Sequence, residues 1–362
     1  MNSRSGNVSR RAWLAGAPAL AARSGTGDEV RFGRPVRVAI VGFDGHTGEI
    51  TKALPVLPEV EVAAISDASP AALERAARHP RLKAARRYTR YEEMLDREKL
   101  DVVAVCNANG DRAAAILACA GRKLNVVAEK PLAITAADLA RVRKSVAASG
   151  IHLGMLLPMR YSPPYLALKQ LVDSGEIGEV GQIAAQKSYK PGNRPPWMRR
   201  KESYGGTIPW IGSHMVDLMR FCSGREFTEV VSYQTRFAHP GIGEMENVTG
   251  SLFRLDNGGV GTLRMDYFRP ETAPTHGDDR LRLAGTRGVA EYQAATGVTI
   301  VSAGRKPEVL HNLPPERLLF AEYLESVYNG KTPSLTLADI YRVCDIVLAA
   351  RESAERRAIV KL

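Results

Sequence analysis

Short runs of apolar, β-branched residues recur through the first half of the chain, with stretches of helical pattern between them. Such runs are typical of strands buried on both faces of a sheet, and they span Val36–Val41, Val60–Ile65, Val102–Cys106 and Asn125–Ala128. Intervening helices are predicted by Ser69 before Pro70, by the alanine-rich Asp111–Gly121 and by a Thr-x-x-Asp cap that begins Thr135–Ser149. Strands that alternate with helices predict a parallel, doubly wound sheet.

The alternation stops after Leu157, and strand patterns dominate the second half. Several of the runs alternate apolar and polar residues, as an antiparallel sheet with one covered face does. They span Phe227–Phe237, Asn247–Leu255, Gly259–Phe268, Arg280–Ala284 and Val298–Val301, and helices are predicted at Pro163–Ser174, Ile208–Cys222, Pro315–Tyr328 and Leu337–Arg351. The chain is therefore predicted to be an α/β protein, with one domain over 35–157 and a second, α+β domain over 158–362.

Composition excludes several classes of protein. With 362 residues, 44% hydrophobic and 25% charged, the chain is neither wholly disordered nor collagen-like nor a disulfide-stapled miniprotein. The net charge of +11 is scattered, without a basic stripe interleaved with aromatic residues, so nucleic-acid binding is not expected. Its four cysteines are far apart, which argues against a disulfide framework or a metal site. No apolar run is long enough to span a membrane.

The N-terminal segment carries a twin-arginine pattern. Ser9–Leu14 contains Arg10 and Arg11, a weakly apolar run of small residues follows, and Ala19-Leu20-Ala21 fits a cleavage site. Residues 1–34 are therefore interpreted as a signal and linker that directs the folded protein to the periplasm. The alternative is a tail in which two arginines are adjacent by chance, in a protein that stays in the cytoplasm.

The loop after the first predicted strand is rich in glycine. Glycines there permit a tight turn and close approach of a pyrophosphate to a helix N-terminus. The spacing G-x-x-G-x-x-G is one residue longer than the usual dinucleotide-binding pattern. The strand before it and the helix after it favour a dinucleotide site, with cofactor contacts predicted at Gly42, Phe43, Gly45, His46 and Thr47.

Asp67 ends the second predicted strand, 19 residues after Gly48. A carboxylate in this place accepts hydrogen bonds from ribose hydroxyls and repels a 2′-phosphate, which predicts NAD rather than NADP as the cofactor. Asp67 could instead be a turn residue at the start of the Ser69 helix.

Several short motifs in the rest of the chain occur in a specific order. They are Ala128-Glu129-Lys130-Pro131-Leu132, Met159-Arg160-Tyr161, the segment 171–180, Gly205-Gly206, Gly212–Leu218, Leu255–Thr262 and Leu283–Gly288. In order and spacing they resemble the glucose–fructose oxidoreductase/inositol dehydrogenase (Gfo/Idh/MocA) family, over nearly everything from Val36 to Leu362.

The resemblance implies a Rossmann domain, a second domain with an open, mostly antiparallel sheet, and a homo-oligomer (a dimer or a tetramer). It also implies an NAD-dependent oxidoreductase that acts on a secondary hydroxyl of a sugar, cyclitol or related polyol. Lys130 and His214 would be the catalytic residues, because both match family positions at the reacting hydroxyl. Cofactor contacts are further assigned to Glu129, Lys130, Asn107 and Asn109, and substrate contacts to Arg160, Trp210 and His214.

Two segments depart from the family pattern. Trp210 stands where the family often has an aspartate four residues before the histidine, which puts the usual mechanism in doubt. We expect it to offer a sugar an apolar stacking surface, and Asp217 could replace the carboxylate, although a structural role suits it better. Asn107-Ala108-Asn109 stands where relatives commonly have Thr-Pro. Lys190–Tyr204 is predicted to be a loop over the pocket whose charges either meet an acidic sugar or are solvated.

Two other functions stay open at this point. Some relatives keep NAD bound and cleave a glycosidic bond by transient oxidation of the sugar, and Trp210 together with export favours this alternative. A non-catalytic ligand-binding relative is the other.

Overall fold

The computed structural model describes residues 28–238 and 240–362. The twin-arginine pattern and the cleavage site lie outside the described residues. Within those ranges, the structure contains no helix that is both long and apolar enough to cross a membrane.

The first half forms a six-stranded parallel sheet, in the order β3-β2-β1-β4-β5-β6. Its strands are β1 (Val36–Val41), β2 (Val60–Ser66), β3 (Arg86–Tyr88), β4 (Val102–Val105), β5 (Asn125–Glu129) and β6 (Leu153–Leu156). The helices are α1 (Gly48–Ala53), α2 (Pro70–Ala76), α3 (Tyr91–Arg97), α4 (Asn109–Gly121) and α5 (Ala136–Ser149). The doubly wound parallel sheet predicted from the sequence is confirmed.

Local chemistry explains where the predicted helices begin. The Ser69 hydroxyl accepts a hydrogen bond from the Ala72 amide, and the Thr135 hydroxyl accepts one from the Asp138 amide. The pattern did not predict β3, α3 or β6. β3 is a three-residue edge strand with two exposed arginines, so it has no apolar run to reveal it.

The second half forms a nine-stranded sheet in the order β14-β13-β12-β11-β7-β10-β9-β8-β15, antiparallel except between β7 and β10. The strands are β7 (Val180–Tyr189), β8 (Phe227–Thr235), β9 (Val248–Leu255), β10 (Val260–Asp266), β11 (Gly277–Gly285), β12 (Gly288–Gln293), β13 (Gly297–Ser302), β14 (Arg305–Val309) and β15 (Val360–Lys361). The helices are α6 (Pro163–Asp173), α7 (Lys201–Tyr204), α8 (Thr207–Ser223), α9 (Leu319–Tyr328) and α10 (Leu337–Arg356), with short 3₁₀ turns at Leu54–Val56, Pro158–Tyr161, Pro196–Arg199 and Pro240–Ile242.

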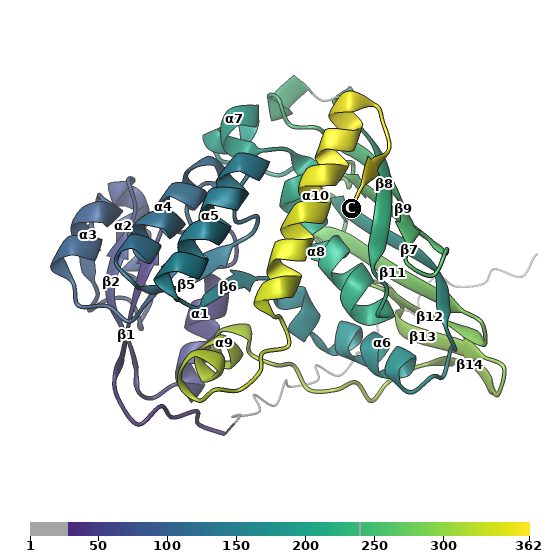
Figure 1. Ribbon diagram of the computed structural model, residues 1–362, viewed down its shortest axis with the longest axis horizontal. Helices are drawn as coiled ribbons and strands as arrows, with labels where there is room; N and C mark the ends of the chain where they lie inside the picture. The colour runs from purple at the N-terminus through teal and green to yellow at the C-terminus, as the bar shows by residue number, and fades with distance from the viewer. Residues whose placement is uncertain (1–27, 239) are drawn as a thin grey trace, which may run out of the picture.

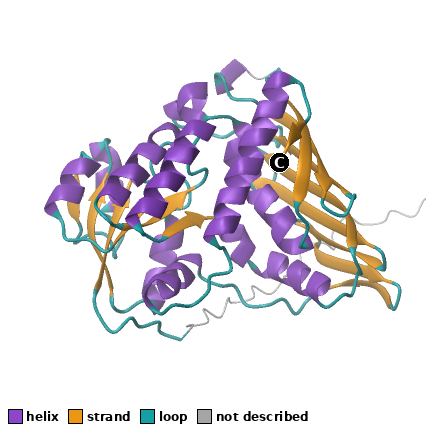
Figure 2. Cartoon of the chain, viewed as in Figure 1, coloured by secondary structure: helices purple, strands orange, loops and turns teal. Residues whose placement is uncertain are grey.

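Helices fill the space between the two sheets. In Figures 1 and 2, α5, α8 and α10 lie in the middle of the molecule, and no helix covers the outer face of the nine-stranded sheet. Nearly every residue of α8 is buried. The six-stranded sheet ends at Leu156, next to the boundary predicted at residue 157, but α9 returns from the second half to pack against α1. Helix α8 therefore presents side chains of the second half to the half that contains the six-stranded sheet.

Candidate active site

A cavity of about 540 Å³ opens at the carboxyl ends of β1, β2 and β4. Its lining includes Gly42, Asp44, Asp67, Asn107 and Asp111. In open α/β sheets, ligands bind at this edge, where the strand order reverses. The reversal here falls between β1 and β4. The cavity therefore lies where a dinucleotide is expected.

Two of the three loop glycines are required by close packing. A Cβ on Gly42, whose φ is +77°, would lie 2.6 Å from the Asn107 Cα, and one on Gly45, whose φ is +69°, would lie 2.5 Å from the Glu129 Cδ. Gly48 has no atom near its Cβ position and begins α1. The loop thus needs glycine where the chain passes closest to β4 and β5, and not at the start of the helix.

Two other predicted loop residues have structural contacts. Phe43 is half-buried and packs against the core, and the Thr47 hydroxyl donates to the Asp44 carbonyl at 3.3 Å without capping α1. Burial raises the pKa of Asp44, the loop residue whose side chain lines the cavity.

Asp67 combines the two roles considered from the sequence. Its Oδ1 accepts a hydrogen bond from the Ser69 amide at 2.8 Å, as a turn residue would. Its side chain also lines the cavity, and its Oδ2 accepts no hydrogen bond within the described part of the chain. One carboxylate oxygen is therefore free to accept from a ribose hydroxyl.

Asn107 and Asn109 differ in what their amides contact. The Asn107 Oδ1 is buried and has no partner among the described residues, so it can accept from a ligand in the adjoining cavity. The Asn109 Nδ2 donates to the Tyr204 carbonyl at 2.8 Å, and its Oδ1 accepts from Arg112 at 2.9 Å. Asn109 is buried and holds α4 against α7, so both polar groups of its side chain have partners within the protein, and its cofactor contact stays a prediction.

Glu129 lies beneath the glycine-rich loop and holds it. Its buried carboxylate accepts from the backbone amide of His46 at 3.1 Å and contacts the His46 Nδ1 at 3.0 Å. Burial opposes its ionisation, but the His46 ring and Lys130 keep the pKa of Glu129 below its ordinary value. Glu129 therefore positions His46 and Lys130.

Lys130 lies against Trp210 of α8. Its Nζ donates to the Trp210 carbonyl at 2.9 Å and lies 3.2 Å from the centre of the indole ring, a cation–π contact. Burial lowers the pKa of Lys130 to about 7. The fully buried Arg112 donates to the carbonyls of Lys130 and Pro131 and fixes this segment.

Trp210 does not present an open stacking surface. Its side chain is 8% exposed, one ring face meets the Lys130 ammonium, and the Trp197 ring meets it edge-on with centroids 5.8 Å apart. The sugar-stacking role predicted for Trp210 is therefore replaced, in this structure, by contact with Lys130.

His214 follows Trp210 by one helical turn and is also buried. Its ring lies edge-on to the His46 ring, with centroids 4.8 Å apart, and its Nδ1 has no partner within the described residues. Burial, and then the positive charge of Lys130, holds the pKa of His214 well below its ordinary value. A neutral imidazole with an unpartnered nitrogen can accept a proton.

The structure does not place Arg160 beside Lys130 and His214. Its guanidinium is buried and paired with Asp217, 3.0 Å from Nε to Oδ2, and it also contacts Asp339. These partners give Arg160 the contacts of a structural ion pair, and its substrate contact stays a prediction. The same pairing explains why Asp217 cannot serve as a replacement carboxylate.

Sequence reasoning missed two buried cations near the site, Arg112 and Lys187, and the half-buried Asp279. Arg112 was hidden in an alanine-rich helix. Lys187 lies in β7, a strand that was not predicted, and its Nζ donates to Asp279 of β11 at 2.8 Å. The register that places these two residues opposite each other was not detectable from either segment alone.

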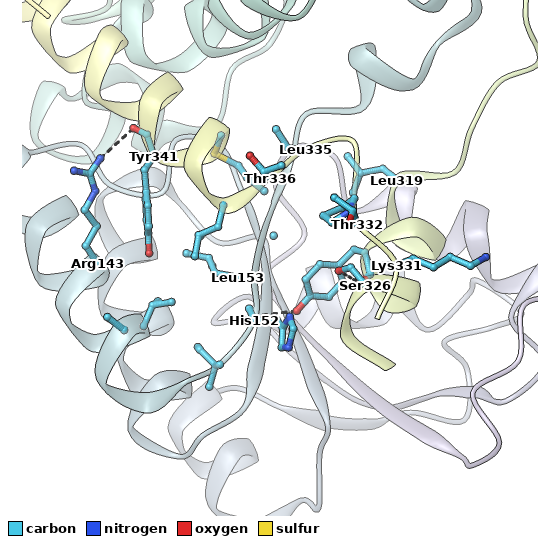
Figure 3. A pocket seen from close by; sticks show the side chains of 18 of the residues that line it. Arg143, His152, Leu153, Leu319, Ser326, Lys331, Thr332, Leu335, Thr336 and Tyr341 are labelled. Carbon is cyan, nitrogen blue, oxygen red and sulfur yellow. Dashed lines mark hydrogen bonds between the residues drawn. The ribbon is translucent and has the colours of Figure 1, made fainter. Parts of the chain in front are cut away.

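Another cavity, of about 620 Å³, lies between α5, β6 and the segments around α9 and α10. Figure 3 shows Arg143, His152, Lys331 and Tyr341 around it, with Arg143 donating to the Tyr341 carbonyl at 3.2 Å. None of the predicted site residues lines it, so it is separate from the group formed by Lys130 and His214.

Both halves of the chain match models of known protein families. Residues 36–155 match an oxidoreductase family with an NAD-binding Rossmann fold, and residues 165–291 match the GFO/IDH/MocA C-terminal domain. Myo-inositol 2-dehydrogenase of Thermotoga maritima is 24% identical over 90% of this chain and 98% of its own.

Solved structures agree with this match. An oxidoreductase structure from Thermotoga maritima is 30% identical, with a TM-score of 0.86 over 90% of this chain and 100% of that one. Levoglucosan dehydrogenase in complex with NADH is 19% identical, with a TM-score of 0.80 over 91% of this chain and 99% of that one, and shows the same fold.

Proposed function

Because the chain belongs to the Gfo/Idh/MocA family of NAD-binding oxidoreductases, we propose that it transfers a hydride between NAD and a secondary hydroxyl of a sugar, cyclitol or related polyol. The observation that carries this proposal is the hydrogen bond from Lys130, which follows β5, to Trp210 of α8. The same helix also holds His214. The polyol class is supported by the 24% identical relative, which is named for the oxidation of myo-inositol.

The cavity at the sheet edge fits the adenosine half of the cofactor. Gly42 removes the side chain that would otherwise collide with Asn107, Asn107 offers an unpartnered buried oxygen, and Asp67 offers a free carboxylate oxygen. When bound, NAD supplies the hydride acceptor. This chain's residues then have to orient the substrate and take up the hydroxyl proton.

Two groups suit that proton transfer. Lys130, with a pKa of about 7, is substantially neutral near physiological pH and can accept a proton through its Nζ. His214 is neutral and has an unpartnered Nδ1. His46 connects this pair to Glu129, and its side chain is 30% exposed, so protons can pass from the buried groups to solvent.

We propose NAD rather than NADP as the cofactor. Four carboxylates line the cavity (Asp44, Asp67, Glu92 and Asp111), and Arg90 is the one cation among its lining residues. This environment disfavours the additional charge of a 2′-phosphate. Titration of the purified protein with each dinucleotide tests the assignment, and Asp67→Ala should reduce the preference for NAD. Equal binding of both cofactors by the parent protein would contradict it.

The activity is tested by incubating the protein with NAD⁺ and neutral or acidic polyols, and following NADH absorbance. Myo-inositol, scyllo-inositol, glucose and its sugar acids form a suitable panel. We expect at least one member to reduce NAD⁺ at a rate that Lys130→Met lowers. Release of cleaved sugar from an aryl glycoside without added NAD would instead favour the glycosidase alternative.

We further propose a homo-oligomer that forms through the outer face of the nine-stranded sheet. Tyr233 is 68% exposed there and Leu252 45%, beside a hollow of about 640 Å³. Large exposed apolar side chains on one face are typical of interfaces. Light scattering should give a mass of two or four chains, and Tyr233→Glu should lower it.

Export by the twin-arginine route is also a proposal, which rests on the sequence of residues 9–22 alone.

A further inference from the structure

A second group of charged side chains lies on the inner face of the nine-stranded sheet, near the candidate site. Lys187 of β7 is fully buried, and its ammonium lies 2.8 Å from the Asp279 Oδ2 and 3.2 Å from the Met159 Sδ. The other oxygen of Asp279, Oδ1, is buried without a partner in the described part of the chain. A buried lysine needs such a carboxylate, because an unpaired charge in the interior is costly.

Aromatic side chains join Lys187 to the Lys130 end of the site. Lys130 lies on the Trp210 ring, and the Tyr204 ring lies 6.4 Å from that ring. The Tyr204 hydroxyl lies 3.2 Å from the hydroxyl of Tyr267.

The wall then continues to the buried lysine. The rings of Tyr267 and Tyr189 are 6.3 Å apart, and the Lys187 ammonium lies 4.9 Å from the centre of the Tyr189 ring. Trp210, Tyr204, Tyr267 and Tyr189 therefore form one continuous aromatic wall with a buried lysine at each end.

Arg194 adds a third cation to this wall. Its guanidinium lies 4.9 Å from the centre of the Tyr267 ring. Its Nε donates to the Pro191 carbonyl at 2.7 Å and its Nη2 to the Lys190 carbonyl at 3.0 Å, which holds the side chain in place. Its Nη1 has no hydrogen-bond partner among the described residues, so it is available to a ligand.

The other cations of this loop point elsewhere. Arg199 and Arg200 are exposed, and Lys201 is exposed and pairs with Glu355 of α10. The structure thus separates two possibilities for the loop charges: Arg194 lies at the aromatic wall, while Arg199, Arg200 and Lys201 are at the surface.

Arg194 has no carboxylate partner at this wall. Lys187 pairs with Asp279 and Glu129 contacts His46, whereas the guanidinium of Arg194 donates only to backbone carbonyls within the described residues. Lys187 and Arg194 are near enough to Lys130 to contribute to its lowered pKa. A half-buried guanidinium without a carboxylate partner attracts an anion to the site.

We propose that the substrate is a sugar acid, a polyol with a carboxylate group, and that Arg194 binds this carboxylate. The inference rests on the proposed function, because it places the reacting hydroxyl at Lys130 and His214. In the oxidation, the carbinol C–H bond breaks and its hydride passes to NAD⁺. The O–H proton passes to Lys130 or His214, and a C=O bond forms. The carboxylate is unchanged in the reaction and serves only to bind and orient the substrate.

Matched substrates test the proposal. Glucose and glucuronate share the pyranose ring and differ at C6, which is a hydroxymethyl group in one and a carboxylate in the other, so the ratio of their kcat/KM values isolates the carboxylate. We expect an acid to exceed glucose by at least the order of 10- to 100-fold, the range for a charge-assisted hydrogen bond. Arg194→Gln should raise the KM for the acid by a similar factor with little change in kcat, while Arg199→Gln, from the same loop, should behave as the parent.

A binding measurement separates this inference from the proposed function. The melting temperature of the protein with NADH should rise with gluconate or glucuronate, and the rise should shrink in Arg194→Gln and with added salt. A protein that binds the acids in this way but oxidises no polyol would support the inference and contradict the oxidoreductase proposal. Preference for glucose, or acids that neither react nor shift the melting temperature, would overturn the inference.

Discussion

Lys130 imposes a stability cost that depends on pH, and removing its charge tests the site without any substrate. The side chain is 2% exposed, and burial lowers its pKa from 10.5 to about 7. The unfolded chain therefore binds more protons than the folded chain between these two values. Stability accordingly rises with pH through this window, and the full cost is present below about pH 7.

The magnitude follows from the same two values. A lowering from 10.5 to about 7 corresponds to about 5 kcal/mol at pH values below the folded-state pKa. Near pH 9.5 the folded lysine is neutral and the cost falls to about 1 kcal/mol. Lys130→Met removes the charge and keeps the length of the side chain, but it loses the hydrogen bond to the Trp210 carbonyl, which contributes about 1 kcal/mol.

We therefore expect Lys130→Met to be more stable than the parent by about 4 kcal/mol near pH 6 and to match it near pH 9.5. The measurement is urea unfolding of both proteins at both pH values, followed by tryptophan fluorescence. Lys306→Met, at an exposed lysine of β14, is the control and should show no pH-dependent difference. If Lys130→Met changes the free energy of unfolding equally at the two pH values, the lowered pKa of the buried Lys130 is refuted.

Three further predictions follow from single features. His214→Asn should bind NAD normally but lower kcat by about 10²- to 10⁴-fold, the range for a lost proton-transfer group, measured once a substrate is found. Gly42→Ala should lower the melting temperature and weaken NAD binding, because its Cβ would collide with β4, whereas Gly48→Ala, with open space at its Cβ, should do neither. Arg10→Lys combined with Arg11→Lys should retain the protein in the cytoplasm, and unchanged fractionation would contradict the export signal.

The sequence predicted the arrangement of elements well where burial and capping act locally. The runs Val36–Val41 and Val102–Val105 are buried strands, and Ser69 and Thr135 cap their helices as their spacing indicated. Strand β7 was missed although it is central to the nine-stranded sheet. Its inward-facing Lys187 breaks the apolar alternation, because that lysine pairs with Asp279 of β11 inside the protein.

The candidate site residues were named from the sequence, but their partners were not. Lys130 and His214 were placed by the resemblance, and both lie where the two domains meet. The partners of Asn109 and Arg160 were not predicted, because residues distant in the sequence contact their polar groups. Arg160 pairs with Asp217, 57 positions away, and nothing local to either residue reveals that pair.

The aromatic residue at position 210 changes the acid–base chemistry of the lysine beneath it. A carboxylate this close to a buried ammonium stabilises the charged form and raises its pKa. Trp210 instead excludes water and offers only a ring face and a carbonyl oxygen, so Lys130 loses hydration without gaining a full negative partner. Glu129, 3.8 Å away, is already engaged by His46. The tryptophan thus favours a lysine that accepts a proton near neutral pH, the property that a base for alcohol oxidation needs.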